Sequence, residues 1–173
     1  MLFLGLFFFI TLTILTVCDS LRLKITPTPS NRKVVMMLSN FINHKTDFKK
    51  IVDLGSGFGL TLVFLALKFP QIEFLGIEDS YFPFLFSTLL KKVLKIKNLN
   101  FVKGNFFHLK EIHADMIYCY LYPDRSKAIS YFLKKVLKPK TLVCSSTFAL
   151  KLKLEQEIKV PDMYQTPLYI YEI

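Results

Sequence analysis

Apolar and polar positions follow two different periods along this chain, and their alternation predicts an α/β protein. Between residues 31 and 42 apolar residues recur at near-helical spacing, which predicts a helix ahead of the first strand. Short apolar runs then alternate with longer amphipathic stretches. The expected strands are a run ending near Leu54, then 73–77, 100–103, 115–121 and 141–146. The expected helices run from the glycines after Leu54 to Phe69, from after Asp79 to about Ile96, and over 124–137 with the Asp124 carboxylate as its cap.

This order of strands and helices indicates a doubly wound, mostly parallel sheet of the Rossmann-like kind. After Ser146 the chain has room for a hairpin, for which 157–160 and 168–171 are the candidate strands, but little room for another helix. We therefore expect a fold that is trimmed at the C-terminus. A Phe-rich run over 81–87 suits either the core or a membrane surface, and we favour the core.

The first 18 residues carry no charge, and they are just long enough to cross a thin bilayer as a helix. We interpret 1–18 as a transmembrane anchor, 19–30 as a basic linker and 31–173 as one catalytic domain. Basic residues follow the span, so the positive-inside rule predicts a single-pass protein of the membrane, the inner one in a bacterium, whose domain faces the cytoplasm. A cleaved signal peptide, a lipoprotein site at LTVC and a buried helix remain alternatives.

Composition invites a nucleic-acid function, because the net charge is +10 and the sequence pI is about 9.5. The lysines are scattered, however, and no stripe of basic and aromatic residues appears. An AT-rich genome or attraction to anionic lipid would explain the charge equally well. We therefore do not expect nucleic acid as a substrate. Cysteines and histidines lack the spacing of metal sites, so no metal is expected.

The stretch IVDLGSGFG carries the most specific chemical signal. Gly55, Gly57 and Gly59 follow a strand end, where the backbone must turn sharply and lie close to a ligand. Glu78 ends the next apolar run, roughly 20 residues further on, where a carboxylate can accept hydrogen bonds from ribose hydroxyls. Dinucleotide-binding loops read GxGxxG, but Leu60 stands where their third glycine would be. The pattern predicts an adenosine-containing cofactor.

These residues resemble motif I of the class I methyltransferases that use S-adenosyl-L-methionine. The resemblance implies that the glycine loop wraps the methionine portion, that Glu78 binds the ribose, and that a pair after the third strand frames the adenine. The cofactor-binding residues that it implies are Asp53, Gly55, Ser56, Gly57, Gly59, Glu78, Gly104 and Asn105, with Thr28 from a segment that folds over the cofactor. The family usually carries an acid where this chain has Phe58.

Four segments, TPTPSNRKVVMML, YLYP, KKVLKPKTLV and the C-terminal YIYEI, are together similar to small membrane-anchored protein-lysine methyltransferases. Better-known relatives of those enzymes modify the ATP synthase c-subunit and the adenine nucleotide translocase. This resemblance implies that Tyr122 and Pro123, with Tyr120, shape the slot for the methyl acceptor. It implies membrane lipid and a membrane-protein lysine as partners and leaves the oligomeric state unknown. A methyltransferase of a lipid-phase small molecule and a non-catalytic membrane protein with a degenerate cofactor site remain alternatives.

Overall fold

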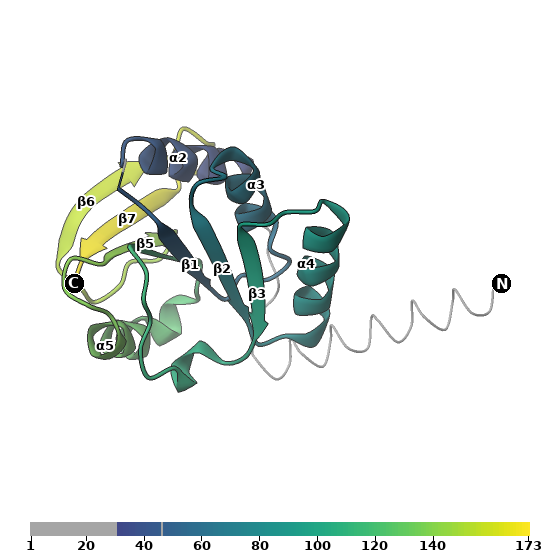
Figure 1. Ribbon diagram of the computed structural model, residues 1–173. Helices are drawn as coiled ribbons and strands as arrows, with labels where there is room; N and C mark the ends of the chain where they lie inside the picture. The colour runs from purple at the N-terminus through teal and green to yellow at the C-terminus, as the bar shows by residue number, and fades with distance from the viewer. Residues whose placement is uncertain (1–30, 46) are drawn as a thin grey trace, which may run out of the picture.

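The computed structural model describes residues 31–173 apart from residue 46, and these residues build one sheet with helices on both faces (Figure 1). The strands are β1 (Lys50–Leu54), β2 (Glu73–Glu78), β3 (Leu99–Lys103), β4 (Met116–Cys119), β5 (Leu142–Ser146), β6 (Leu154–Lys159) and β7 (Pro167–Glu172). The helices are α2 (Arg32–Asn43), α3 (Leu60–Lys68), α4 (Tyr81–Val93) and α5 (Ser126–Val136), with the 3-10 turns η1 (Phe106–His108) and η2 (Pro123–Arg125).

The strand order is β3-β2-β1-β4-β5-β7-β6. The pairs from β3 to β5 are parallel, whereas β7 runs antiparallel between β5 and β6. The chain reverses its direction of winding between β1 and β4, and ligands of open α/β sheets bind at the carboxyl ends of strands beside such a switch point. The expectation of a Rossmann-like, mostly parallel sheet is therefore confirmed.

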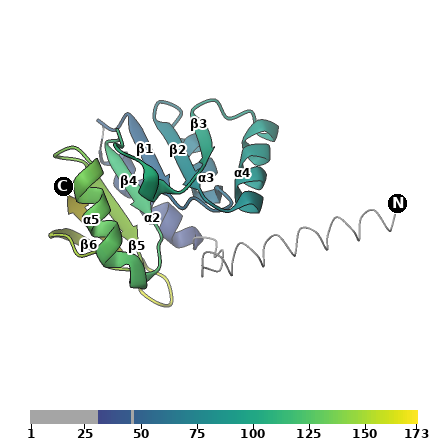
Figure 2. The ribbon, with the colours of Figure 1, turned by 90° about the horizontal axis from the view of Figure 1, so that it is seen from below.

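Successive strand residues face opposite sides of the sheet and so feed two apolar cores. Ile51 joins a core with the buried faces of α2 and α3, while its neighbour Val52 joins a second core with α5. Helix α4 lies beside β3, and α5 lies beside β4 and β5, as Figure 2 shows from below. The core lies on both sides of the central strands, so the carboxyl ends of β1, β2 and β4 are held rigidly.

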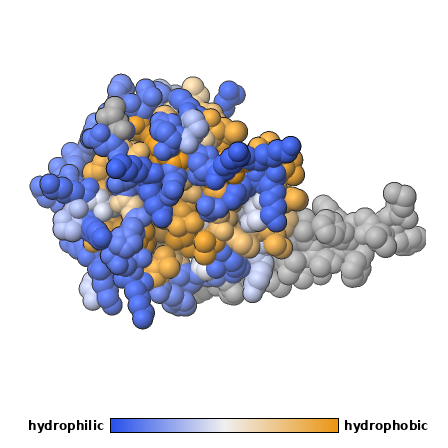
Figure 3. All heavy atoms as spheres, viewed as in Figure 1, coloured by the Kyte–Doolittle hydropathy of each residue, from blue (hydrophilic) through white to orange (hydrophobic). Residues whose placement is uncertain are grey.

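Between β3 and β4 the chain forms only the short 3-10 turn η1 and no α-helix. This side of the sheet keeps a hollow of about 480 Å³. Its lining includes Val52, Leu75, Ile77, Val102 and Ile112. Hydrophobic residues, coloured orange, gather over the middle of this face in Figure 3. Between β5 and β6 the chain again lacks a helix, as expected for a trimmed fold.

Three local expectations need correction. Asp124 does not cap α5, because the chain first makes the turn η2 and the helix begins only at Ser126, with Arg125 at the N-cap position and no side-chain cap bond. Strand β4 ends at Cys119 and not at Leu121. The Phe-rich run was expected in the core, but α4 buries only Pro83 and Ser87 and leaves Leu85 exposed.

The expected anchor over residues 1–18 lies outside the described residues. Within 31–45 and 47–173, every helix is too short or too polar to cross a bilayer.

Candidate active site

The glycine loop leaves β1 at Leu54 and turns back onto β2. The backbone N–H groups of Gly55 and Ser56 both donate to the carbonyl oxygen of Ile77, at 2.9 and 3.1 Å. Gly57 has a φ of 54°, and a β-carbon built there would have no heavy atom within 4 Å apart from those of its chain neighbours Ser56 and Phe58. The loop therefore presents open space in front of Gly57, which is what a closely approaching ligand needs.

Gly59 has a different role, although it belongs to the same motif. A β-carbon at Gly59 would lie 2.4 Å from Cζ of Phe101 on β3. Gly76 in β2 is equally crowded, because its β-carbon would meet Phe101 at 2.5 Å and the hydroxyl of Ser56 at 2.6 Å. These two glycines allow close packing of the loop on the sheet. The Ser56 side chain faces Gly76, and its hydroxyl is buried without a hydrogen-bond partner among the described residues.

Glu78 fixes the loop from the end of β2. The residue as a whole is 7% exposed. One oxygen, Oε2, accepts a hydrogen bond from the backbone N–H of Gly57 at 2.7 Å, and the other, Oε1, accepts one from the N–H of Ser80 at 2.7 Å. Carboxylate oxygens have further lone pairs, so the same group can still accept bonds from two hydroxyls of a ligand. Ser80 was not anticipated from the sequence, since backbone donors leave no residue-type signal.

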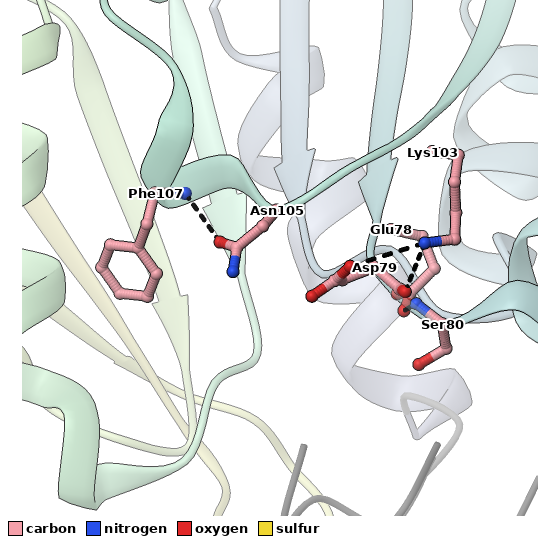
Figure 4. Close-up of polar contacts among 6 residues, drawn as sticks. All are labelled: Glu78, Asp79, Ser80, Lys103, Asn105 and Phe107. Carbon is pink, nitrogen blue, oxygen red and sulfur yellow. Dashed lines mark hydrogen bonds and ion pairs between the residues drawn. The ribbon is translucent and has the colours of Figure 1, made fainter. Parts of the chain in front are cut away.

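The ends of β2 and β3 meet beside Glu78 (Figure 4). The N–H of Gly104 donates to the carbonyl oxygen of Glu78 at 2.9 Å, and a β-carbon at Gly104 would again meet open space. Asn105 turns its side chain the other way, accepting the N–H of Phe107 at 3.0 Å. The structure thus brings Gly104 next to Glu78, whereas the Asn105 oxygen is used to start η1.

Lys103, the last residue of β3, contacts the residues that follow Glu78. Its ammonium donates to the carbonyl oxygen of Asp79 at 2.6 Å, lies 3.4 Å from the Asp79 carboxylate, and sits 4.1 Å from the centre of the Tyr81 ring. The ammonium and the ring make a cation–π contact. The sequence analysis missed Lys103, because a lysine at a strand end has no distinguishing pattern.

Asp53 is a buried acid in β1, just before the loop. It is 3% exposed, and its neighbours in the sheet are Gly76 and Tyr118. Burial, followed by the nearby charge of Glu78, raises the pKa of Asp53 to about 8. At neutral pH the Asp53 side chain is therefore mostly an uncharged acid.

Phe58 packs sideways against α4. Its ring makes edge-on contacts with Phe82 and Phe86, with ring centres 5.7 and 5.4 Å apart. The aromatic ring that replaces the acid usual in the resembled family therefore packs against α4.

On the acceptor side, Tyr120 and Tyr122 follow β4, and Pro123 begins η2. Both tyrosine rings stack with Phe148, which follows β5: the ring centres are 6.1 Å apart for Tyr120 and 6.0 Å apart for Tyr122. Phe148 was not anticipated, and its only signal is its place two residues beyond a strand end. Thr28 lies outside the described residues.

The arrangement fits an adenosine-containing ligand. Open space in front of Gly57 and Gly104 flanks a buried carboxylate that is already oriented by two backbone donors. A ribose offers hydroxyl donors that match such an acceptor.

Comparison with known proteins identifies the family. A protein of Helicobacter pylori (strain ATCC 700392 / 26695) named ribosomal RNA small subunit methyltransferase G is 32% identical over 133 residues, which are 73% of this chain and 71% of that protein. The chain belongs to the ribosomal RNA small subunit methyltransferase G family. The protein of the same name from Mycoplasma pneumoniae is 30% identical over 133 residues, covering 76% of this chain and 66% of that protein. No protein-family model matches the sequence.

Solved structures agree on the fold. An RNA methyltransferase from Salinibacter ruber, in complex with S-adenosyl-L-homocysteine, aligns with a TM-score of 0.74 at 21% identity, over 84% of this chain and 94% of that one. A methyltransferase from Thiobacillus denitrificans in complex with the same compound has a TM-score of 0.57 at 18% identity, over 69% and 50% of the two chains. Together with the family assignment, these matches confirm that the chain is a methyltransferase whose cofactor is S-adenosyl-L-methionine.

Membership of the methyltransferase G family corrects the finer predictions. The resemblance to membrane-anchored protein-lysine methyltransferases pointed to the wrong branch of the class, because the glycine loop and the ribose acid are shared by many branches. Membrane lipid and a membrane-protein lysine as partners, and the exclusion of nucleic acid, are contradicted by relatives named for ribosomal RNA. The same relatives contradict the predicted location as a single-pass membrane protein.

Proposed function

We propose that this chain transfers a methyl group from S-adenosyl-L-methionine to RNA of the small ribosomal subunit. The observation that carries the proposal is a match to a protein named for that activity. The two sequences are 32% identical, and the match covers 71% of that protein's length. The net charge of +10 supports it, because lysine and arginine side chains neutralise phosphates and release counterions on binding.

The residues have distinct roles in this proposal. Glu78 holds the ribose hydroxyls, and its bonds to Gly57 and Ser80 keep the carboxylate in place before the cofactor arrives. Gly104 and Asn105 frame the adenine. Bound S-adenosyl-L-methionine supplies a methyl group that its positive sulfur has already activated.

The glycine loop lies against the methionine portion of the cofactor in this proposal. Gly55 and Gly57 let the backbone approach, while Ser56 and Gly59 hold the loop against β2 and β3. Asp53 supports the loop from β1. Thr28 is proposed as a further contact from the segment ahead of α2.

Tyr122 and Pro123, with Tyr120, bound the acceptor side at the carboxyl end of β4. Transfer of an activated methyl group needs alignment of the acceptor atom with the methyl carbon and exclusion of water, and positioning alone can supply several kcal/mol. The chain's contribution is therefore mainly geometric.

Transfer of a tritiated methyl group tests the proposal. The purified protein is incubated with labelled S-adenosyl-L-methionine and small ribosomal subunits from a bacterium that lacks its own methyltransferase G, and the RNA, protein and lipid fractions are counted. Label in the RNA is expected, and Glu78→Ala serves as the reference that should fail to transfer it. Label confined to protein or lipid, or no label in any fraction, would overturn the proposal.

A further inference from the structure

The aromatic residues beside the acceptor side form a small stack that opens to solvent. The rings of Tyr120 and Phe148 are nearly parallel, at 9°, and those of Tyr122 and Phe148 are inclined by 26°. Tyr122 nevertheless leaves 47% of its surface exposed. The stack therefore presents an exposed aromatic ring at the carboxyl ends of β4 and β5.

A strained turn holds Phe148 in this position. Thr147 has a φ of 69°, which is unfavourable for a β-branched residue. The N–H of Phe148 donates to the carbonyl oxygen of Ser146 at 2.8 Å, so the chain makes a γ-turn with its rare handedness. Strained backbone of this kind persists where surrounding contacts over-determine it, and it gathers at functional sites.

The surrounding contacts are present. The buried hydroxyl of Ser145 donates to the carbonyl oxygen of Phe148 at 2.6 Å, and the N–H of Thr147 donates to the carbonyl oxygen of Pro167 at 2.8 Å. Three residues after Phe148, the N–H of Lys151 donates to the hydroxyl of Ser130 on α5 at 2.8 Å. The segment after β5 is thus fixed to β7 on one side and to α5 on the other.

Cations accompany the rings along both segments. Arg125 and Lys127 follow Tyr122 by three and five positions, and Lys151 follows Phe148 by three, against the single acid Asp124 within these stretches. Aromatic faces next to cationic side chains are the usual means by which proteins bind single-stranded nucleic acid, because every base has a face that can stack.

We propose that Tyr122 and Phe148 form a stacking platform for the base of the acceptor nucleotide. This proposal rests on the proposed RNA methyltransferase function and names how that site holds its substrate. Phe148, aligned by the turn at Thr147 and backed by Tyr120, orients Tyr122, whose exposed face receives the base. The acceptor atom is thereby presented toward the cofactor side of the sheet edge.

The test compares Tyr122→Leu, Phe148→Leu and Tyr122→Phe with the wild-type protein, and uses Tyr131→Leu as a matched control. Tyr131 is a 74% exposed tyrosine on α5 that belongs to no ring stack described above. Two quantities are measured. The first is the quenching of 2-aminopurine fluorescence when a short single-stranded RNA carrying this base binds, which reports stacking. The second is the KM for small-subunit RNA in methyl transfer. Calorimetry with S-adenosyl-L-homocysteine reports whether each variant retains its fold and cofactor site.

We expect the two leucine variants at Tyr122 and Phe148 to lose the quenching and to raise KM about five- to a hundredfold, as the loss of one base–aromatic stack does. Tyr122→Phe should retain the quenching because it keeps the ring, and Tyr131→Leu should match the wild type. Wild-type quenching and KM in Tyr122→Leu, with RNA methylation intact, would overturn the platform alone. A wild-type protein that neither binds nor methylates RNA would overturn the proposed function and the platform with it.

Discussion

The carboxylate of Glu78 accepts a hydrogen bond from the backbone N–H of Gly57, 21 positions earlier in the chain, at 2.7 Å. The acid that is expected to bind the ribose is therefore also the anchor of the glycine loop. Because Ser80 donates to the other carboxylate oxygen, the side chain is held in one orientation without a ligand. Such preorganisation reduces the entropic cost of binding.

Replacing Glu78 by alanine should weaken the binding of S-adenosyl-L-homocysteine by about 2 to 4 kcal/mol, because the two hydrogen bonds that the ribose hydroxyls donate to this carboxylate are lost. Glu78→Gln should also weaken it, since an amide NH₂ placed at either oxygen position would face a backbone N–H. Isothermal titration calorimetry measures both. Glu73→Ala, at the exposed start of the same strand, is the control. Unchanged affinity in Glu78→Ala would show that the cofactor does not lie at Glu78.

Phe58→Ala should lower the free energy of unfolding by about 1 to 3 kcal/mol, because two edge-on ring contacts to α4 are lost. Phe58→Asp, which places an acid where the methyltransferases resembled by the motif carry one, should be destabilised at least as much. Urea denaturation gives both values. Phe64→Ala removes a similarly sized but exposed ring on α3 and should cost less. Equal losses at positions 58 and 64 would mean that the contacts to α4 contribute little.

Asp53 should make stability depend on pH. The folded protein raises the pKa of Asp53 from the ordinary 3.8 to about 8, so the folded state retains a proton that the unfolded state releases. The free energy of unfolding should therefore fall as pH rises from about 4 to about 8 and level off above that range. Asp53→Asn cannot ionise and should flatten this slope, as seen by denaturation of the cofactor-free protein at several pH values. A slope in Asp53→Asn equal to that of the wild-type protein would refute the assignment.

Asn98 supplies a side-chain hydrogen-bond donor at the C-terminal end of α3. Its side-chain amide lies within hydrogen-bond distance of the carbonyl oxygens of Ala66, Phe69 and Ile72, at 3.1, 3.0 and 2.9 Å. Asn98→Ala removes this side-chain donor. Of the three oxygens, that of Phe69 keeps a backbone donor, the N–H of Ile72, so the loss falls mainly on the other two and should cost about 1 to 3 kcal/mol of unfolding free energy. Thermal and urea unfolding measure the loss. Asn100→Ala removes an exposed amide two residues away and should change stability by less than about 0.5 kcal/mol. A loss no larger than that of Asn100→Ala would contradict this role.

The sequence predicted the cofactor half of the molecule well, for a physical reason. The glycine loop and Glu78 belong to one strand–helix–strand unit, and the length of that unit fixes their spacing in the fold. Local periodicity was therefore sufficient to place α2, β1, α3 and β2 within a few residues. The proposed roles of the individual residues in binding the cofactor stay predictions that the experiments above address.

The acceptor half could not be predicted in the same way. Phe148 reaches Tyr120 and Tyr122 from a different strand, and its position depends on a strained turn at Thr147 that no residue pattern announces. Asp124 looked like a helix cap because the sequence does not reveal that η2 precedes α5. Scattered lysines seemed to argue against nucleic acid, yet charges far apart in sequence can face one surface once the chain is folded. Substrate class therefore came from the family and not from the pattern.

The position of β7 between β5 and β6 has a consequence for biosynthesis. Strand β6 leaves the ribosome before the strand with which it pairs, and β5 keeps one bare edge until the same late segment arrives. Until β7 has been made, the backbone N–H and C=O groups along these two strand edges lack their partners in the sheet, and such edges can pair with other nascent chains. Because β6 pairs only with β7, residues 167–172 both cover the exposed edge of β5 and join β6 to the sheet, so β5 is protected from such pairing only once this segment has been made.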